Sequence, residues 1–192
     1  MKQKLQSIIV VLFVLFVLFP HFSFAQQMED EITVPSLPPT ITITPTPDYS
    51  MPYPGILPDN PLYGIKTFRD KIISIMIGDP LKKASFDLLQ ADKRIGAALL
   101  LIKTKERAKQ ELALSTISKG QNYYEDAIAR LAEAKKQGAG STEITTNLKR
   151  ASVQHLYLLQ QAKKTLPKIL QPTMEQLIQR SQRLQTQVKN IK

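Results

Sequence analysis

The chain has no cysteine in its 192 residues. Disulfide bonds, a thiol nucleophile and cysteine-based metal clusters are therefore excluded, and any folded part must be held together by packing alone. Only two histidines are present, and the glycines are scattered singly rather than gathered in a phosphate-binding loop. Because so few residue types that perform chemistry are present, the sequence favours a structural or binding role over catalysis.

Residues 1–25 have the pattern of an export signal. Two lysines lie within the first four residues, residues 8–19 are an unbroken apolar run, and small residues precede a cleavage point after Ala25. The alternative is an uncleaved membrane anchor, but the run has 12 residues before Pro20, and a spanning helix needs about 20. We therefore expect an exported, extracytoplasmic protein that is secreted or associated with the cell envelope. If the leader is not cleaved, it is instead an N-terminal membrane anchor.

Residues 26–57 differ in composition from the rest of the chain. Nine prolines and five acidic residues lie between residues 26 and 61, with no Lys or Arg. Because proline removes backbone donors and fixes φ, we expect a disordered, extended Pro/Thr-rich spacer rather than helix or sheet. A proline-rich docking ligand or a glycosylated stalk is the alternative, although no PxxP motif with aromatic and basic flanks supports docking.

A folded domain is expected over residues 58–192. Asn60 is suited to cap a helix that begins at Pro61, where the missing proline N–H costs nothing. Apolar residues then recur at helical spacing until Gly78 ends this first helix. Asp79-Pro80 repeats the combination of capping residue and proline at the start of a second helix. The apolar positions of the first helix are Leu62, Ile65, Phe68, Ile72, Ile73, Ile75 and Met76.

Four further helices are predicted by apolar stripes that repeat in steps of three and four residues, the spacing of coiled coils and of helices packed along their length. The residues expected to end or open them are Gly138, Gly140, Ser141 or Thr142, Pro167 and Pro172. The stripes are Leu81, Ala84, Leu88, Ala91, Ile95, Ala98 and Ile102; Leu114, Ile117, Gln121, Tyr124, Ile128 and Leu131; Ile144, Leu148, Ala151, His155, Leu158 and Ala162; and Met174, Leu177, Ser181, Leu184, Val188 and Ile191.

The segment from Lys103 to Lys109 interrupts the apolar stripe of the second helix, which runs from Leu81 to Ile102. Continuing the register would bring Lys105 and Lys109 into the core, and burying an unpaired lysine is costly. A turn or kink is therefore expected there. The alternative is one continuous helix from Pro80 to Gln137, about 87 Å long.

These elements predict an all-α fold, an antiparallel helical bundle of four long helices plus one shorter N-terminal helix. Tyr63 is expected to pack the short helix across the bundle or at one of its ends. The bundle core is rich in Leu, Ile and Ala, and Gly96 is expected to let a neighbouring helix approach. Such a core needs no cofactor to fill it.

Three short motifs resemble the bacterial domain-of-unknown-function family 5667. They are "PDNPLYGIK" at residues 58–66, "GDPLKKA" at residues 78–84 and "ADKRI" at residues 91–95, and the resemblance extends over about residues 57–190. It implies an exported or membrane-tethered helical domain, in some cases part of regulatory proteins outside the membrane. It implies no active site, so no catalytic residue is carried over, and this chain is basic where relatives are often rich in Glu.

His155 is the one histidine after the leader, and it lies on the stripe of the fourth helix. It is interpreted as a core histidine bonded to a neighbour, because no residue at helical spacing completes a metal site. Nothing marks a serine for a Ser–His–Asp arrangement, and the adjacent Glu125 and Asp126 are expected to be solvated. We predict no enzyme, no catalytic residue, no metal and no cofactor.

Charge is the strongest compositional signal. Residues 62–192 contain 24 Lys and Arg against 11 Asp and Glu, a net charge of +13. Basic residues outside the apolar stripes are candidates for contact with a polyanion, although aromatic side chains of the kind that stack on bases are not interleaved. These candidates are Lys82, Lys83, Lys93, Arg94, Lys103, Lys105, Arg107, Lys109, Lys135, Lys136, Lys149, Arg150, Lys163 and Lys164.

Two functions follow from these patterns. The first is a non-enzymatic interaction or structural module of the bacterial cell envelope, whose partner is an envelope protein. The alternative is electrostatic binding of an extracellular polyanion (anionic lipid, wall polymer or nucleic acid) through the basic helix faces, without sequence-specific recognition of nucleic acid.

Overall fold

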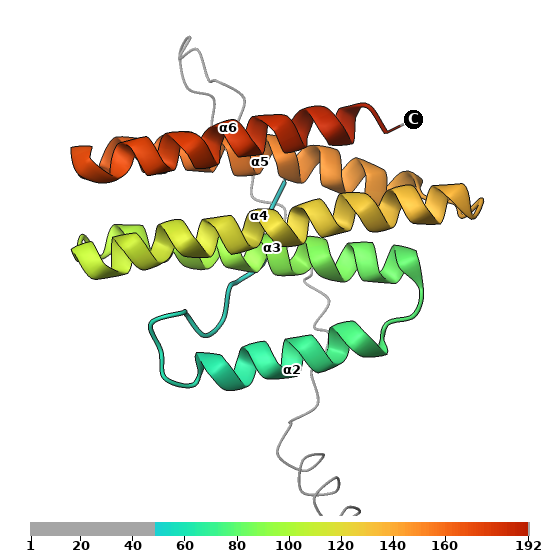
Figure 1. Cartoon of the computed structure of the whole chain (residues 1–192), viewed down its shortest axis with the longest axis horizontal. Coiled ribbons are helices and arrows are strands. Elements are labelled where there is room, and N and C mark those ends of the chain that lie inside the picture. The colour runs from blue at the N-terminus through green and yellow to red at the C-terminus, as the bar shows by residue number, and fades with distance from the viewer. Residues whose placement is uncertain (1–48, 192) are drawn as a thin grey trace, which may run out of the picture. The chain divides into compact units, whose positions relative to one another are not determined.

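The computed structural model describes residues 49–191 (Figure 1). The predicted leader and residues 26–48 of the predicted spacer lie outside this range. The described elements are α2 (Tyr63–Met76), α3 (Pro80–Lys103), α4 (Arg107–Lys136), α5 (Thr142–Thr165), the 3-10 helix η1 (Lys168–Leu170) and α6 (Gln171–Lys189). No strand occurs within residues 49–191, so the all-α prediction is confirmed for that part of the chain.

The four long helices pack as two pairs. α3 lies along α4, and α5 lies along α6; across the pairs, α3 contacts α5 and α4 contacts α6. Successive helices run in opposite directions through short connections (Figure 1). We refer to α3–α6 as the four-helix body. Its apolar side chains form two clusters, one near the α3–α4 turn around Ile95, Ile117 and Met174, and one toward the opposite end around Leu88, Leu131 and Leu148.

The apolar stripes of the four long helices are largely confirmed. Most of the predicted positions are buried, because each helix turns its apolar side toward the helices it packs against. Leu81, Ile128 and Ile191 are only half-buried. In α5 the buried residue is Leu159 rather than the predicted Leu158, since a step of four from His155 continues the inward face of the helix.

The close approach between helices occurs at Gly120 rather than at Gly96. A Cβ atom on Gly120 of α4 would lie 3.1 Å from side-chain atoms of Arg94 and Ile95 on α3, and 3.2 Å from the carbonyl oxygen of Ala91. Gly96 is instead in ordinary contact with Met51 and Pro54, which come from the segment before α2. The absence of a side chain at Gly120 therefore allows α3 and α4 to pack closely.

The predicted turn near Lys105 is confirmed, and a single helix from Pro80 to Gln137 is excluded. α3 ends at Lys103, α4 begins at Arg107, and Lys105 adopts a left-handed φ of 61°. Two side chains satisfy carbonyl groups at the end of α3: Thr104 Oγ1 donates to Leu101 O at 2.8 Å, and the buried Gln110 Nε2 donates to Ile102 O at 3.3 Å.

The capping predictions are confirmed in part. Asp79 accepts a hydrogen bond from the backbone N–H of Lys82 at 2.9 Å, and Pro80 is the first residue of α3. α2 begins at Tyr63, two residues later than predicted, and Asn60 Oδ1 accepts from the backbone N–H of Leu62. Residues 57–62 form turns before α2, so Asn60 fixes the approach to the helix rather than its first turn.

Candidate functional site

α2 presents its apolar side to solvent. Phe68 is 67% exposed, Ile75 73% and Met76 79%, and Leu62, Ile65, Ile72 and Ile73 are also exposed. We define these seven residues as the apolar face of α2. The sequence predicted that Tyr63 packs this helix onto the bundle, which implied that the apolar positions near it are covered, and the structure shows them exposed. The helix is amphipathic as predicted, but its orientation is reversed.

The side of α2 that faces the four-helix body is polar. Tyr63, Thr67, Asp70 and Ser74 follow one another in steps of four and three residues, with Lys66 beside Thr67, and all five are buried or half-buried. Because this polar stripe faces the four-helix body, the apolar residues on the opposite side of α2 face solvent.

Two charged groups on the inward side of α2 illustrate the cost of this orientation. Asp70 is 4% exposed; its Oδ1 accepts from Arg69 at 2.7 Å, and its buried Oδ2 has no hydrogen-bond partner within the described residues. Lys66 Nζ donates to Pro54 O at 2.6 Å and to Ile56 O at 3.2 Å. Burial lowers the pKa of Lys66, although the nearby Asp70 opposes the shift.

Arg94 joins α2 to the four-helix body. Its guanidinium carbon lies 5.1 Å from the ring centre of Tyr63 on α2 and 5.5 Å from that of Tyr123 on α4, and the residue is buried. These are cation–π contacts. Tyr63 therefore does connect α2 to the body, but through a charged partner rather than an apolar one.

Residues 49–57, at the end of the predicted spacer, lie against α3. Met51 and Leu57 pack against the cluster near the α3–α4 turn, and Pro54 is buried. Tyr49 donates a hydrogen bond from its hydroxyl to Asp92 Oδ2 at 2.7 Å. Burial, followed by the charge of Asp92, raises the pKa of Tyr49 and keeps it a donor. This segment thus fixes the chain to α3 immediately before α2.

A buried Asp–His pair lies between α3 and α5. Asp92 Oδ1 is 2.7 Å from Nε2 of His155, and both residues are almost completely buried. Tyr124 meets the His155 ring edge-on at 5.5 Å and donates to Leu148 O at 2.6 Å; burial raises the pKa of Tyr124. The core location expected for His155 is observed. Asp92 was not among the predicted functional residues, and its one signal in the sequence is its position beside Ala91 in the buried stripe.

The space beside His155 is too small for a substrate. A cavity of about 10 Å³ is bounded by His155, Tyr124, Gln121, Ser152 and Ser181, which is the room that one water molecule needs. Asp92 is the one carboxylate that bonds His155 in the described structure. The pair therefore has the properties of a structural link between α3 and α5.

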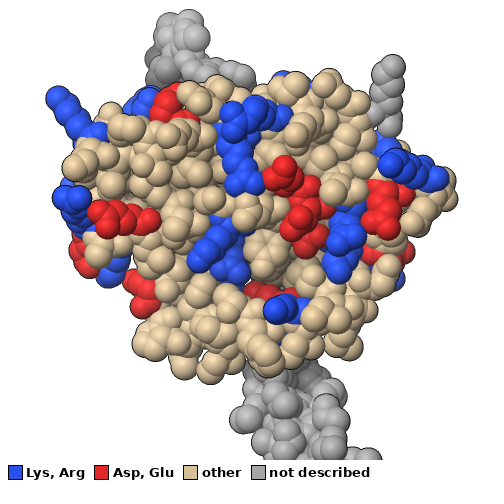
Figure 2. Space-filling model, in the orientation of Figure 1, with Lys and Arg blue, Asp and Glu red and all other residues tan. Residues whose placement is uncertain are grey.

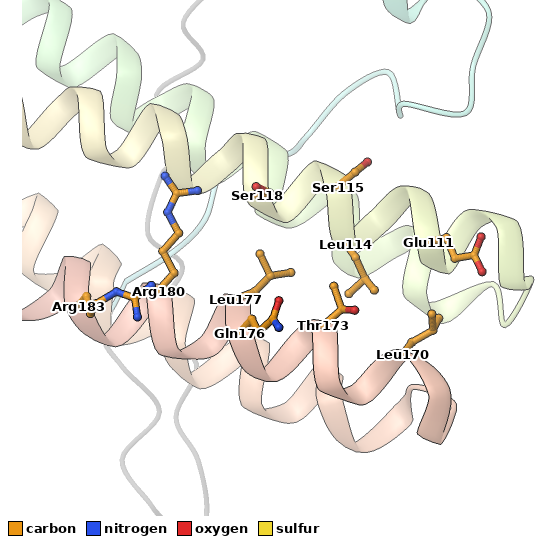
Figure 3. Close-up of a pocket in the computed structure, with 10 residues that line it drawn as sticks. All are labelled: Glu111, Leu114, Ser115, Ser118, Leu170, Thr173, Gln176, Leu177, Arg180 and Arg183. Carbon is orange, nitrogen blue, oxygen red and sulfur yellow. The ribbon is translucent and has the colours of Figure 1, made fainter.

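A wider groove lies between α4 and α6 (Figure 3). It has a volume of about 650 Å³ and is open to solvent. Figure 3 shows Glu111 at one end and Arg180 and Arg183 at the other, with Leu114 and Leu177 between them. Arg180 donates to Glu125 at 2.7 Å, so one of the two cations is already engaged. The groove separates its charged groups and does not bring an acid and a base together.

The candidate basic residues are distributed over the whole four-helix body. Lys82 and Lys83 lie at the start of α3, Lys103, Lys105, Arg107 and Lys109 at the α3–α4 turn, Lys135 and Lys136 at the end of α4, Lys149 and Arg150 within α5, and Lys163 and Lys164 at its end. Lys93 and Arg94 are in the middle of α3, and Arg94 is the buried member of the set. The structure therefore brings together small groups at the helix ends rather than one patch.

Several of these cations have acidic partners. Arg107 bonds Glu111 at 2.9 Å, Lys109 lies 3.0 Å from Glu106, and Lys163 bonds Glu175. The hydrogen bond to Glu106 raises the pKa of Lys109. On the face shown in Figure 2, Lys and Arg side chains lie among Asp and Glu side chains. The positive charge of the sequence is therefore partly compensated on that face.

Asp87 of α3 supplies a test of the electrostatics of the body. Burial, with a contribution from Asp126 on α4, raises its pKa to about 6. The folded state thus holds this proton more tightly than the unfolded state does, so stability should fall as pH rises from about 4 through about 6. We expect Asp87→Asn to leave the melting temperature nearly unchanged at pH 4 and to raise it by at least about 2 °C at pH 7.

Thermal unfolding followed by circular dichroism between pH 4 and pH 8 measures this effect. Asp126→Asn, at an exposed position, is the matched control and should give a smaller increase, because it removes only the neighbouring charge. An increase for Asp87→Asn that is equal at pH 4 and pH 7 would contradict the assignment.

Within the described residues, no helix is both long and apolar enough to cross a membrane. No group of three or more His, Asp or Glu side chains in that same range is arranged to hold a metal ion.

The fold and its surfaces define a class: an all-α domain whose most distinctive exposed feature is an amphipathic helix with its apolar side outward. The model of the domain-of-unknown-function family DUF5667 matches residues 55–190. The chain belongs to this family, as the motifs beginning at Pro58 indicated. No curated protein and no solved structure gives a significant match to the chain.

Proposed function

We propose that this protein is an exported, non-enzymatic interaction module of the bacterial cell envelope, and that the apolar face of α2 is its contact surface. The proposal treats α3–α6 as an antiparallel four-helix bundle that serves as a scaffold. The observation that supports it is the exposure of the apolar face of α2. Exposed apolar side chains that gather on one face mark interaction sites rather than ordinary surface.

Contact rather than catalysis is supported by the state of the reactive side chains. His155 is buried and bonded to Asp92, beside a cavity with room for one water. The groove between α4 and α6 holds its carboxylate, Glu111, away from its arginines (Figure 3). A general acid–base pair needs two groups within reach of one substrate, and neither site supplies this arrangement.

The alternative, electrostatic binding of an extracellular polyanion through the basic helix faces, has less support. The net charge of +13 over residues 62–192 favours it. The pairing of Arg107, Lys109 and Lys163 with acids, and the engagement of Arg94 by two tyrosine rings, reduce the charge available for a ligand. A polyanion that binds these cations would have to displace the acids that pair with them. Because exposed ion pairs are weak, such displacement is the step on which this alternative depends.

The test compares envelope association of the natural chain with that of a triple variant, Ile65→Ser/Phe68→Ser/Ile75→Ser. Because all three side chains face solvent, the variant should fold with an unchanged melting temperature and yet shift from the envelope fraction to the soluble fraction. The matched control, Leu100→Ser/Val153→Ser/Ile169→Ser, changes three apolar residues that are exposed elsewhere and should not shift. Equal distribution of both variants and the natural chain would refute the proposal.

A further inference from the structure

We infer that the partner of the apolar face of α2 is an anionic lipid surface, on which α2 lies in the plane of the interface. The inference rests on the proposed function, since it names the partner of the same surface. It is carried by the breadth of the apolar face, by the charges beside it and by the position of α2 in the molecule.

The apolar face is broad. With 100° between successive residues of a helix, it extends from Ile75 to Ile73 over roughly 160° of the circumference, with Ile65 near the middle. Arg69 also projects within this arc, between Met76 and Leu62, and turns its charged end to Asp70. A stripe of about 100° is enough to pack a helix against a protein core. A helix that sinks into a lipid interface is surrounded by acyl chains on both flanks and makes use of a wider arc. The breadth therefore fits a lipid surface better than a single packed helix.

The charges around this face are positive. Lys71 is exposed and has no acidic partner among the described residues, whereas Arg69 is exposed but bonds Asp70 at 2.7 Å. Asp70 is the one acidic residue between Leu62 and Met76 and is 4% exposed, so α2 presents no acid to solvent. Long basic side chains at the edge of an apolar face reach lipid phosphates while their methylenes stay in the apolar layer. The charge of α2 is thus complementary to an anionic surface.

The same charges disfavour a second copy of the chain as the occupant. A two-fold dimer uses the same patch on both copies. Pairing two α2 helices through this face would bring the Lys71 side chains of both copies to the edge of the interface, with no outward-facing acid on α2 to compensate them. A dimer through this face would therefore gather like charges, and a phospholipid layer would neutralise them.

The position of α2 allows a flat surface to approach. Among the described elements, α2 lies at the margin, beside α3, and no other helix of residues 49–191 lies over it in the view of Figure 1. Tyr53 and Ile56, in the segment that leads to α2, are exposed as well. The lipid contact needs no rearrangement of α3–α6, because the side of α2 that meets the body is already the polar one.

The test uses the absence of tryptophan from the chain. Phe68→Trp places a single indole on the apolar face of the full chain, and Val153→Trp places one at an exposed site of α5 as the control. On phosphatidylglycerol vesicles we expect a blue shift of about 10 nm or more and quenching by brominated acyl chains for Phe68→Trp alone. The apolar run in residues 8–19 is common to both variants, so the difference between them reports the depth of α2.

Charge reversal tests the anionic component. Lys71→Glu in the Phe68→Trp background should weaken phosphatidylglycerol binding about tenfold, and Lys168→Glu, which changes the net charge equally on η1, should weaken it by less than about twofold. Neutral phosphatidylcholine vesicles should give little shift. Equal shifts on both lipids, or equal effects of the two charge reversals, would overturn the inference.

Two other outcomes separate this inference from the proposed function. A blue shift without vesicles that grows with protein concentration would identify a second copy as the occupant. No shift under any condition, combined with envelope association that is lost in the Ile65/Phe68/Ile75 variant, would identify a protein partner. Each overturns the lipid inference and leaves the interaction module in place; the proposed function fails only if the triple variant also remains in the envelope fraction.

Discussion

Leu88→Asp should abolish the folded state. Leu88 is 5% exposed and belongs to the apolar cluster that includes Tyr124, Leu131 and Leu184. An aspartate there would lose both the packing of the leucine and the hydration of its own charge, a loss of about 4 kcal/mol or more. Because small domains are stable by about 5–15 kcal/mol, we expect loss of cooperative thermal unfolding and a marked fall in the helical circular dichroism signal.

Leu89→Asp is the matched control, since the neighbouring side chain on α3 is 37% exposed. The same chemical change should cost less than about 1 kcal/mol there, because the charge remains hydrated. A Leu88→Asp protein as helical and as stable as Leu89→Asp would show that Leu88 is not part of a core, and the packing of α3 against its neighbours would have to be revised.

His155→Leu should destabilise the protein by about 3–5 kcal/mol in urea unfolding. The substitution leaves the buried carboxylate of Asp92 with Tyr49 as its remaining hydrogen-bond donor. Removing one partner of a buried hydrogen-bonded carboxylate is costly, chiefly because the carboxylate is left short of a donor. The loss should therefore be larger than the change in side-chain volume would suggest.

A double variant separates this explanation from simple repacking. Asp92→Leu/His155→Leu removes both polar groups and should recover part of the stability lost in His155→Leu, because no unpaired charge remains. Tyr49→Phe removes the second donor to Asp92 and should cost about 1–3 kcal/mol. If the free energy of unfolding of the double variant is lower than that of His155→Leu, the loss of the Asp92–His155 contact does not explain the destabilisation caused by His155→Leu.

The four long helices α3–α6 and their buried sides were accessible from the sequence for a physical reason. A helix packed along its neighbours must repeat its apolar residues every three or four positions, and positions such as Leu88, Ile117 and Leu148 carry that repeat. The turn at Lys105 was also predictable, because continuing the helix would have buried lysines. In both cases a local sequence pattern is compatible with one low-energy local structure, a helix with one buried side or a break in the helix.

The orientation of α2 was not accessible in the same way. Its periodicity shows that one side is apolar, but not which side meets the rest of the molecule. That choice depends on Arg94, which is 31 positions after Tyr63 and binds its ring, and on the inward placement of Asp70. The Asp92–His155 pair was missed for a similar reason, since its partners are separated by 63 positions and neither residue alone is unusual.

The distribution of the basic residues is a third case. Pairs such as Lys82-Lys83 and Lys135-Lys136 are evident in the sequence, and most of these cations are exposed or half-exposed as expected of residues outside the stripes. Whether these basic pairs form one patch in the folded protein depends on the lengths of the helices that carry them. Since each helix spans the length of the body, cations near helix ends are divided between its two ends.

The central claim is that α2 turns its apolar side to solvent, and cysteine reactivity tests it most directly because the chain has no cysteine of its own. Single Ile75→Cys and Asp70→Cys variants would be treated with a thiol reagent in dilute, lipid-free solution. We expect Cys at position 75 to react at least about tenfold faster than Cys at position 70, because thiol reactivity follows exposure. Faster reaction at position 70, or protection of position 75 in the monomer, would contradict the account.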